Sequence, residues 1–347
     1  MAYTTINKSS DHFNTKLYTG TSGTINVTGL DFQPDWTWIY NRGGTYASPM
    51  FDALRGVTKL IESTGNGVEN TQSNTLTAFN SDGFTVGADG NSYVNRSSSP
   101  NTYVAWNWKA GGAGSSNTDG SVTSTVSANT TSGFSIVKYT NPSSGSPFTV
   151  GHGLGAAPKM IMIKNITGSA QNWGVYHTAP GFGKYLQLNT TIDEATANLV
   201  TATSNTTFST YYDHHTAGVD LIAYCFAEIK GFSKIGFYRG NGNADGAFAF
   251  CGFKPAFVLF KEYTGAGDAN WVIQDSKRVG FNPNNNRIYP NDSAVENTSS
   301  FRIDMLSNGF KLRSSDGDAN ENGNNFLYLA IAEAPLVGSN NVPATAR

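Results

Sequence analysis

The chain has little charge for its length. Of its 347 residues, 14% are charged, whereas an average soluble domain has roughly 25%. The formal net charge is −2. A protein that follows nucleic-acid phosphates needs a basic surface, so we expect no nucleic-acid partner.

Long apolar runs, cysteines and catalytic signatures are also scarce. The longest apolar runs fall well short of the roughly 20 residues of a transmembrane helix, so no membrane insertion is expected. Cys225 and Cys251 are too few for a disulfide framework or a zinc site, and we expect both to be buried thiols on strands. The patterns G-x-S-x-G, H-E-x-x-H and C-x-x-C are missing. We therefore predict no catalytic residues, no metal and no cofactor, although a glycosidase-type pair of distant carboxylates stays open.

Glycine and small polar residues take the place of the missing charge. The chain has 38 glycines, and 12% of its residues are aromatic. The aromatic content allows a sizeable core, which argues against wholesale disorder.

An internal threefold repeat is the strongest pattern in the chain. A proline-initiated strand recurs at Pro34, Pro158 and Pro255. Each copy follows a tyrosine-containing strand and precedes, at a similar distance, a closing strand; the closing strands are Tyr103–Trp108, Leu221–Phe226 and Phe326–Ile331. Three marks in the same order indicate three related modules.

The repeat predicts how the chain is divided. The expected parts are an N-terminal anchor peptide (1–11), module 1 (12–112), a Gly/Ser linker (113–120), module 2 (121–230), module 3 (231–338) and a polar tail (339–347). Strand-type alternation and frequent Asn-Gly and Asp-Gly turns run through each module. Only Asp193–Val200 has a helical pattern. We predict an all-β fold of three tandem, jelly-roll-like β-sandwich modules of about 100 residues each.

Several polar elements have both a structural and a chemical interpretation. Asp52 with Arg55 recurs as Asp275 with Arg278, and His177 takes the equivalent position in module 2. We expect Asx turns braced by arginine rather than catalytic pairs. The six tryptophans fall in repeated positions, so we expect them in the core, holding modules together.

Two loops resemble ligand motifs only in part. Residues 151–156 match a dinucleotide fingerprint, but a proline and a strand follow instead of a helix, so no phosphate site is predicted. Residues 316–323 open like a calcium loop but lack its sixth-position glycine and twelfth-position glutamate. We expect a hairpin loop there, with a calcium ion as the alternative.

One cluster has no counterpart in the other modules. It consists of Tyr211, Tyr212, Asp213, His214 and His215. Rings beside imidazoles and a carboxylate suit a glycan, a receptor or a divalent ion, whereas a solvated loop is the structural alternative. These five residues are the binding candidates of the sequence.

Several segments resemble virion proteins of tailed bacteriophages, marine ones especially. The resemblance lies in residues 3–9 and 13–20, in Phe32–Trp36, in Tyr103–Trp108 and in Gly151–Pro158, and it spans almost the whole chain. Members of that family are described as tail-fibre-like or virion structural proteins. The resemblance implies a place on the phage particle surface, in the tail or the capsid, and supplies no site residues.

The expected function is therefore that of a non-enzymatic virion surface protein of the tail-fibre or receptor-binding type. Tandem β-modules build length and surface without needing an active site. Expected partners are other virion proteins and a host surface glycan or receptor, with a homo-oligomer, preferably a trimer, as the assembly. Capsid decoration is the first alternative, and a host-glycan depolymerase is the second.

Overall fold

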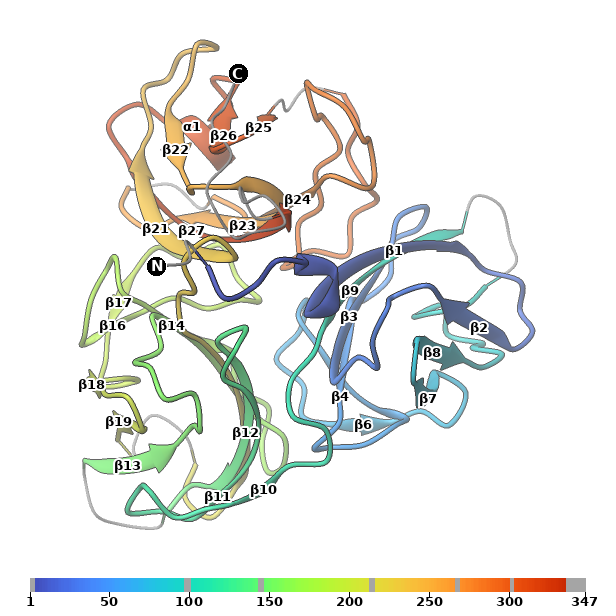
Figure 1. Cartoon of the computed structure of the whole chain (residues 1–347), viewed down its shortest axis with the longest axis vertical. Helices are drawn as coiled ribbons and strands as arrows, with labels where there is room; N and C mark the ends of the chain where they lie inside the picture. Colours follow the sequence, from blue (N-terminus) through green and yellow to red (C-terminus); the bar gives the residue numbers. More distant parts are fainter. Residues whose placement is uncertain are drawn as a thin grey trace.

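The protein is an all-β molecule of three lobes. A computed structural model describes residues 4–96, 101–142, 147–211, 216–265, 269–299 and 303–334. Apart from the 3-10 turn η1 (Ser9–Asp11) and the single-turn helix α1 (Gly317–Asn320), the described elements are strands in antiparallel sheets. Figure 1 shows the lobes around a common centre, in blue, green and orange. We call residues 13–108, 115–226 and 233–334 the first, second and third lobes. The all-β prediction is confirmed.

Each lobe combines one large sheet with one three-stranded sheet. In the first lobe the large sheet has the order β1-β9-β3-β4-β5-β6, and the small sheet has the order β2-β8-β7. These strands are β1 (Phe13–Thr19), β2 (Ile25–Thr28), β3 (Trp36–Asn41), β4 (Pro49–Asp52), β5 (Lys59–Glu62), β6 (Asn70–Thr71), β7 (Leu76–Asn80), β8 (Gly83–Val86) and β9 (Thr102–Trp108).

The second lobe has the large sheet β10-β11-β12-β20-β14-β15, the small sheet β13-β19-β18 and the pair β16-β17. Its strands are β10 (Ser115–Asn117), β11 (Ser124–Asn129), β12 (Phe134–Thr140), β13 (Phe148–Gly151), β14 (Met160–Asn165), β15 (Gly174–His177), β16 (Lys184–Tyr185), β17 (Ala195–Thr196), β18 (Ala202–Thr203), β19 (Thr207–Thr210) and β20 (Asp220–Phe226).

The third lobe has the large sheet β21-β27-β23-β24 and the small sheet β22-β26-β25. Its strands are β21 (Ser233–Arg239), β22 (Phe248–Phe250), β23 (Lys254–Glu262), β24 (Val272–Asp275), β25 (Ile303–Leu306), β26 (Gly309–Leu312) and β27 (Asn325–Ala334).

The same four-strand order lies in all three large sheets. It is β1-β9-β3-β4 in the first lobe, β12-β20-β14-β15 in the second and β21-β27-β23-β24 in the third. The register agrees as well, because the residue two positions after each proline pairs with an equivalent partner. These pairs are Trp36 with Asp52, Met160 with His177 and Phe257 with Asp275. The shared order supports three copies of one jelly-roll-like module, which stays a prediction.

The central strands of the large sheets are buried on both faces. Along β3, Ile39 belongs to an apolar cluster within the first lobe, whereas Trp36, Trp38 and Tyr40 point the other way, into a central core. Residues of all three lobes make up this central core. Burial on both faces explains why these strands are apolar in long stretches rather than strictly alternating.

The tryptophans connect the lobes, as predicted. All six belong to the central core, and none is more than 2% exposed. Trp173 donates its indole N–H to the carbonyl of Glu62 in the first lobe at 2.9 Å. Trp271 donates in the same way to the carbonyl of Gln187 in the second lobe at 2.8 Å. These two indoles therefore fill the core and also bind a main-chain carbonyl of a neighbouring lobe.

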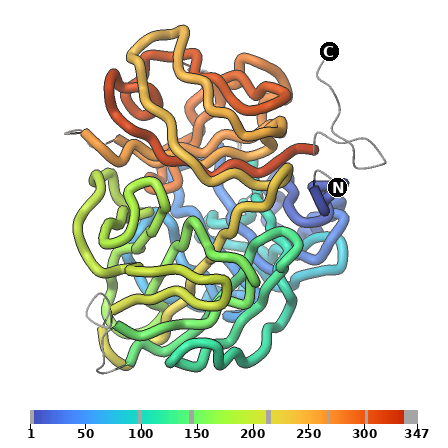
Figure 2. The backbone as a smooth tube through the Cα atoms, turned by 60° about the vertical axis from the view of Figure 1, so that its left-hand side comes forward, coloured from blue at the N-terminus to red at the C-terminus, as the bar shows by residue number. Residues whose placement is uncertain are grey.

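Two segments at the ends of the first lobe differ from expectation. The expected linker, 113–120, contains β10, which pairs with β11 and extends the large sheet of the second lobe. The described part of the expected anchor, residues 4–11, packs on its own chain: Ile6 is 2% exposed in the central core, and η1 contacts both β1 and β27. Figure 2 shows the start of the chain, in blue, at this junction of the first and third lobes. The expected tail, 339–347, lies outside the described residues.

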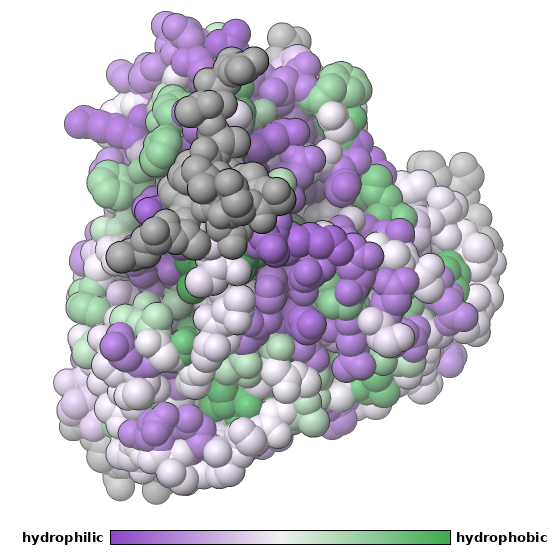
Figure 3. Space-filling view, viewed as in Figure 1, coloured by the Kyte–Doolittle hydropathy of each residue, from purple (hydrophilic) through white to green (hydrophobic). Residues whose placement is uncertain are grey.

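The helical prediction for Asp193–Val200 is wrong. This segment holds β17, which pairs with β16, and Lys184 forms an ion pair with Glu194 at 3.3 Å. Pairing with β16 has outweighed a local helical preference that is weak over so few residues. The face in Figure 3 has hydrophilic residues mainly at its centre and top, many residues of intermediate hydropathy below them, and hydrophobic residues in separate patches.

Candidate functional site

Of the five residues predicted from the sequence as a binding cluster, the structure describes only Tyr211. Tyr211 directly follows β19 and is half-buried. Tyr212, Asp213, His214 and His215 lie outside the described residues. Their role as glycan or receptor contacts stays a prediction, and the site must be sought elsewhere in the described chain.

Two buried ion pairs follow β4 and β24. Asp52 accepts hydrogen bonds from the main-chain N–H groups of Leu54 and Arg55 and from the Arg55 side chain. Asp275 is bound in the same way by the two following N–H groups and by Arg278. All four charged side chains are 0% exposed. The predicted Asx turns braced by arginine are confirmed, and their burial makes them structural elements.

These turns also connect lobes. The Tyr224 hydroxyl of the second lobe donates to Asp52 of the first lobe at 2.8 Å. The Trp106 indole of the first lobe donates to Asp275 of the third lobe at 3.0 Å. Trp106 and Tyr224 occupy equivalent positions on the closing strands β9 and β20. Each aspartate therefore binds its own arginine and a side chain of a neighbouring lobe.

His177 makes the third connection. Its Nδ1 accepts the N–H of Ala179 at 3.0 Å, so in the neutral ring the proton is on Nε2, which faces the carbonyl of Tyr328 in the third lobe at 3.3 Å. Burial lowers the pKa of His177 to about 4. The neutral imidazole of His177 therefore joins the second and third lobes. The carboxylates of Asp52 and Asp275 make the other two contacts between lobes, so that each lobe is bound to both of its neighbours.

A second set of three hydrogen bonds also joins the lobes in pairs, and its donor side chains lie at another repeated position. Tyr40, Lys164 and Lys261 hold the same place after the three prolines, and each donates to a carbonyl of a neighbouring lobe. The respective acceptors are the carbonyl oxygens of Asp292, Asn66 and Thr191, at 3.1, 3.0 and 2.9 Å. Burial lowers the pKa of Lys164 to about 7.

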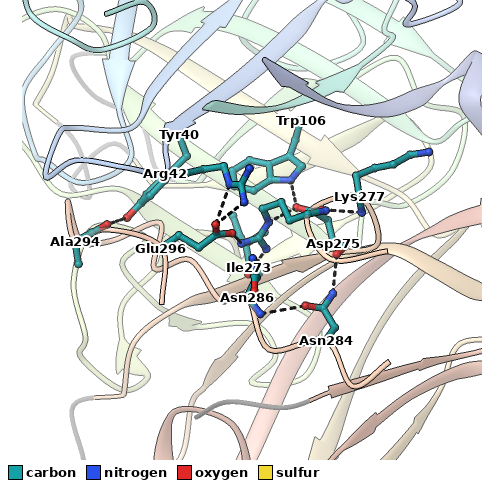
Figure 4. A network of polar contacts seen from close by, with 11 residues as sticks. Tyr40, Arg42, Trp106, Ile273, Asp275, Lys277, Asn284, Asn286, Ala294 and Glu296 are labelled. Carbon is teal, nitrogen blue, oxygen red and sulfur yellow. Dashed lines mark hydrogen bonds and ion pairs between the residues drawn. The ribbon is translucent and has the colours of Figure 1, made fainter. Parts of the chain in front are cut away.

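Figure 4 shows the junction of the first and third lobes, where Arg42 lies against Glu296. Arg42 Nη2 approaches Glu296 Oε2 at 2.7 Å, and Arg278 Nη1 approaches Glu296 Oε1 at 2.7 Å. The Trp106–Asp275 bond lies beside them (Figure 4). The polar side chains of the molecular centre thus bind one another across lobes, and they serve assembly of the fold.

An open groove on the third lobe is the strongest candidate for ligand binding. It has a volume of about 650 Å³ and is lined by residues 234–239 and 247–250, by Tyr328, and by Thr178 and Ala179 of the second lobe. Three phenylalanines of its lining are exposed: Phe237 by 62%, Phe248 by 43% and Phe250 by 60%. Exposed aromatic rings gathered in a concave place are typical of a binding surface.

The chemistry of the groove favours binding over reaction. Arg239 adds positive charge to the exposed rings, whereas Lys234 forms an ion pair with Glu228 at 3.0 Å. The Tyr328 hydroxyl donates to the carbonyl of Phe250 at 3.1 Å, and burial raises its pKa. Burial also raises the pKa of the neighbouring Cys251 thiol to about 12. Neither group is an activated nucleophile at neutral pH.

The calcium-like loop has protein partners for its carboxylates. Asp316 caps α1 and pairs with Arg287 at 2.6 Å. Asp318 accepts from Asn270 and from the Tyr289 hydroxyl. Among the residues that the structure describes, no group of three His, Cys, Asp or Glu side chains is placed to hold a metal.

The sequence contained a weak signal for the groove. Phe248 and Phe250 alternate with Ala249, whose side chain is buried, and Phe237 follows Gly236. By register, Phe237 corresponds to Lys138 of the second lobe. A phenylalanine in the place of a surface lysine could have pointed to this site.

Comparison with known proteins gives one match. A family model described as a domain of unknown function (DUF7483) matches residues 8–335. No curated protein and no solved structure matches the chain significantly. Within the described chain, none of the helices has the length and apolar character needed to cross a membrane.

Proposed function

The chain belongs to the DUF7483 family of domains of unknown function, and we propose that it is a non-enzymatic binding protein on the surface of a tailed-phage particle. The observation that carries the binding role is the groove of the third lobe, with its three exposed phenylalanines. The place in a phage particle rests on the sequence resemblance described above.

The contacts of the buried polar residues support a structural role for them rather than a catalytic one. Both aspartate–arginine pairs are fully buried, and each aspartate also binds a side chain of another lobe. A catalytic group has to reach substrate, which these side chains do not. The groove offers aromatic surface and the Arg239 guanidinium, which suit recognition of a partner.

Two experiments test the proposal: antibody labelling of intact phage particles, and competition between the purified chain and particles for adsorption to host cells. Antibody against this chain should mark the tail of intact particles, and purified chain should compete with particles for host cells. Labelling confined to capsid faces would replace the tail-fibre role with capsid decoration.

Incubation of the purified chain with host surface glycan should release no sugar fragments. Fragment release would overturn the non-enzymatic proposal. Replacing Phe237 and Phe250 by serine should abolish competition, while the matched replacement of the exposed Phe281, which lies outside this groove, should leave it unchanged.

A further inference from the structure

Within the described part of the chain, the groove lies along a sheet edge that has no strand partner. β21 is the edge strand of the large sheet of the third lobe, and its one partner in that sheet is β27. β22 is the edge strand of the small sheet, and the groove lies between β21 and β22. The two-sheet lobe is thus open on this side.

The second lobe closes the equivalent side with a strand of its own. β12 corresponds to β21, because each pairs with the closing strand of its lobe in the same register. In the second lobe β11 pairs along β12, and Val122 bridges to Val150 of the small sheet. The third lobe has only residues 227–232 between β20 and β21 and therefore supplies no such strand.

Main-chain groups of β21 face the open side. The N–H of Ile235 donates to Glu228 Oε2 at 3.2 Å, which shows that this N–H points away from β27. Alternate residues of a strand direct their N–H and C=O to the same edge. The main-chain groups of Phe237 therefore face the groove, in the position that Lys138 has opposite Thr125 of β11.

We propose that the groove binds an extended segment of another polypeptide, which adds to β21 as β11 adds to β12. The inference deepens the proposed function and rests on it for the role of the groove. Strand addition takes affinity from main-chain hydrogen bonds and selectivity from alternate side chains. The segment that fits has small and β-branched residues, as in the β11 sequence Ser124–Asn129.

A peptide with the sequence of residues 121–131 is a direct probe, because it contains β11. Labelled peptide should bind the full-length chain in fluorescence anisotropy, and a scrambled peptide should not. Phe237→Pro removes the outward N–H and should weaken binding by about tenfold or more, the loss expected for hydrogen bonds of this kind. Proline is tolerated on an edge strand whose N–H faces solvent, so the variant should keep its thermal midpoint.

Phe237→Thr is the matched control, because it removes the ring and keeps the N–H. It should lose less affinity than Phe237→Pro. In the unaltered chain, peptide should slow amide hydrogen exchange at Phe237, which keeps the test valid if the proline variant misfolds.

Three results would overturn strand addition: no binding of the probe, an equal loss in both variants, which indicates stacking on the ring as by a glycan, or self-association through the groove. These measurements use purified chain, so their failure is separate from a failure of particle labelling.

Discussion

At the scale of residues, one structural position is filled by two different chemistries. Asp52, Asp275 and His177 pair with equivalent residues of the proline-initiated strands. Each of the two aspartates forms a buried ion pair with the arginine three residues later. His177 stays neutral because burial lowers its pKa to about 4. The lobe contact at His177 therefore depends on an imidazole that is neutral at neutral pH and gains a proton only in acid.

Acid should weaken the contact of the second and third lobes through His177. The unfolded chain binds a proton near pH 6.5, whereas the folded chain resists it down to about pH 4. The stabilisation is thus complete above pH 6.5 and is lost as pH falls toward 4, by about 3 kcal/mol in all. Urea unfolding of the wild-type chain and of His177→Gln, at several pH values between 4.5 and 7.5, measures the difference.

The His177→Gln chain should show a shallower loss of stability than the wild-type chain. Some slope should remain in both, because burial also lowers the pKa of His152. Identical slopes would mean that His177 does not carry the effect.

At the scale of elements, the sequence predicts which strands of the three modules are equivalent better than it predicts what surrounds them. The repeated prolines and closing strands indicated equivalent strands, which share order and register. The pattern of β3 does not say that both faces are buried, because this depends on two other lobes that pack against Trp36 and Trp38. The groove was missed for the same reason, since an open edge at β21 is visible only beside the filled edge at β12.

Close strand pairing predicts a large effect of one glycine. A Cβ at Gly309 would lie 2.1 Å from the carbonyl oxygen of Ala249, where β22 pairs with β26. Gly309→Ala should therefore lower the free energy of unfolding by about 1–3 kcal/mol, the usual cost of overpacking. Gly67→Ala is the matched control, because a Cβ there meets no atom within 4 Å. Equal effects in urea unfolding would contradict this account of the β22–β26 pairing.

At the scale of the whole molecule, three lobes share one core. Each lobe has its own smaller cluster, but the face that carries Phe257, Leu259 and Leu329 of the third lobe is covered by the other lobes. The contacts run from first to second, second to third and third to first lobe, so the ring closes within one chain. The expected homotrimer stays a prediction, and it would have to use other surfaces than this central core.

A shared core predicts cooperative unfolding. Calorimetry of the full chain should give one transition, with equal calorimetric and van't Hoff enthalpies, because losing one lobe exposes the apolar faces of the other two. A truncated chain of residues 231–338 should give no cooperative transition, because its sheet face with Phe257 and Leu259 would meet water. Three separate transitions, or a truncated chain that unfolds cooperatively, would show instead that each lobe is stabilised by its own cluster. In that case the ring of tryptophan, tyrosine and histidine contacts would orient finished lobes rather than complete them.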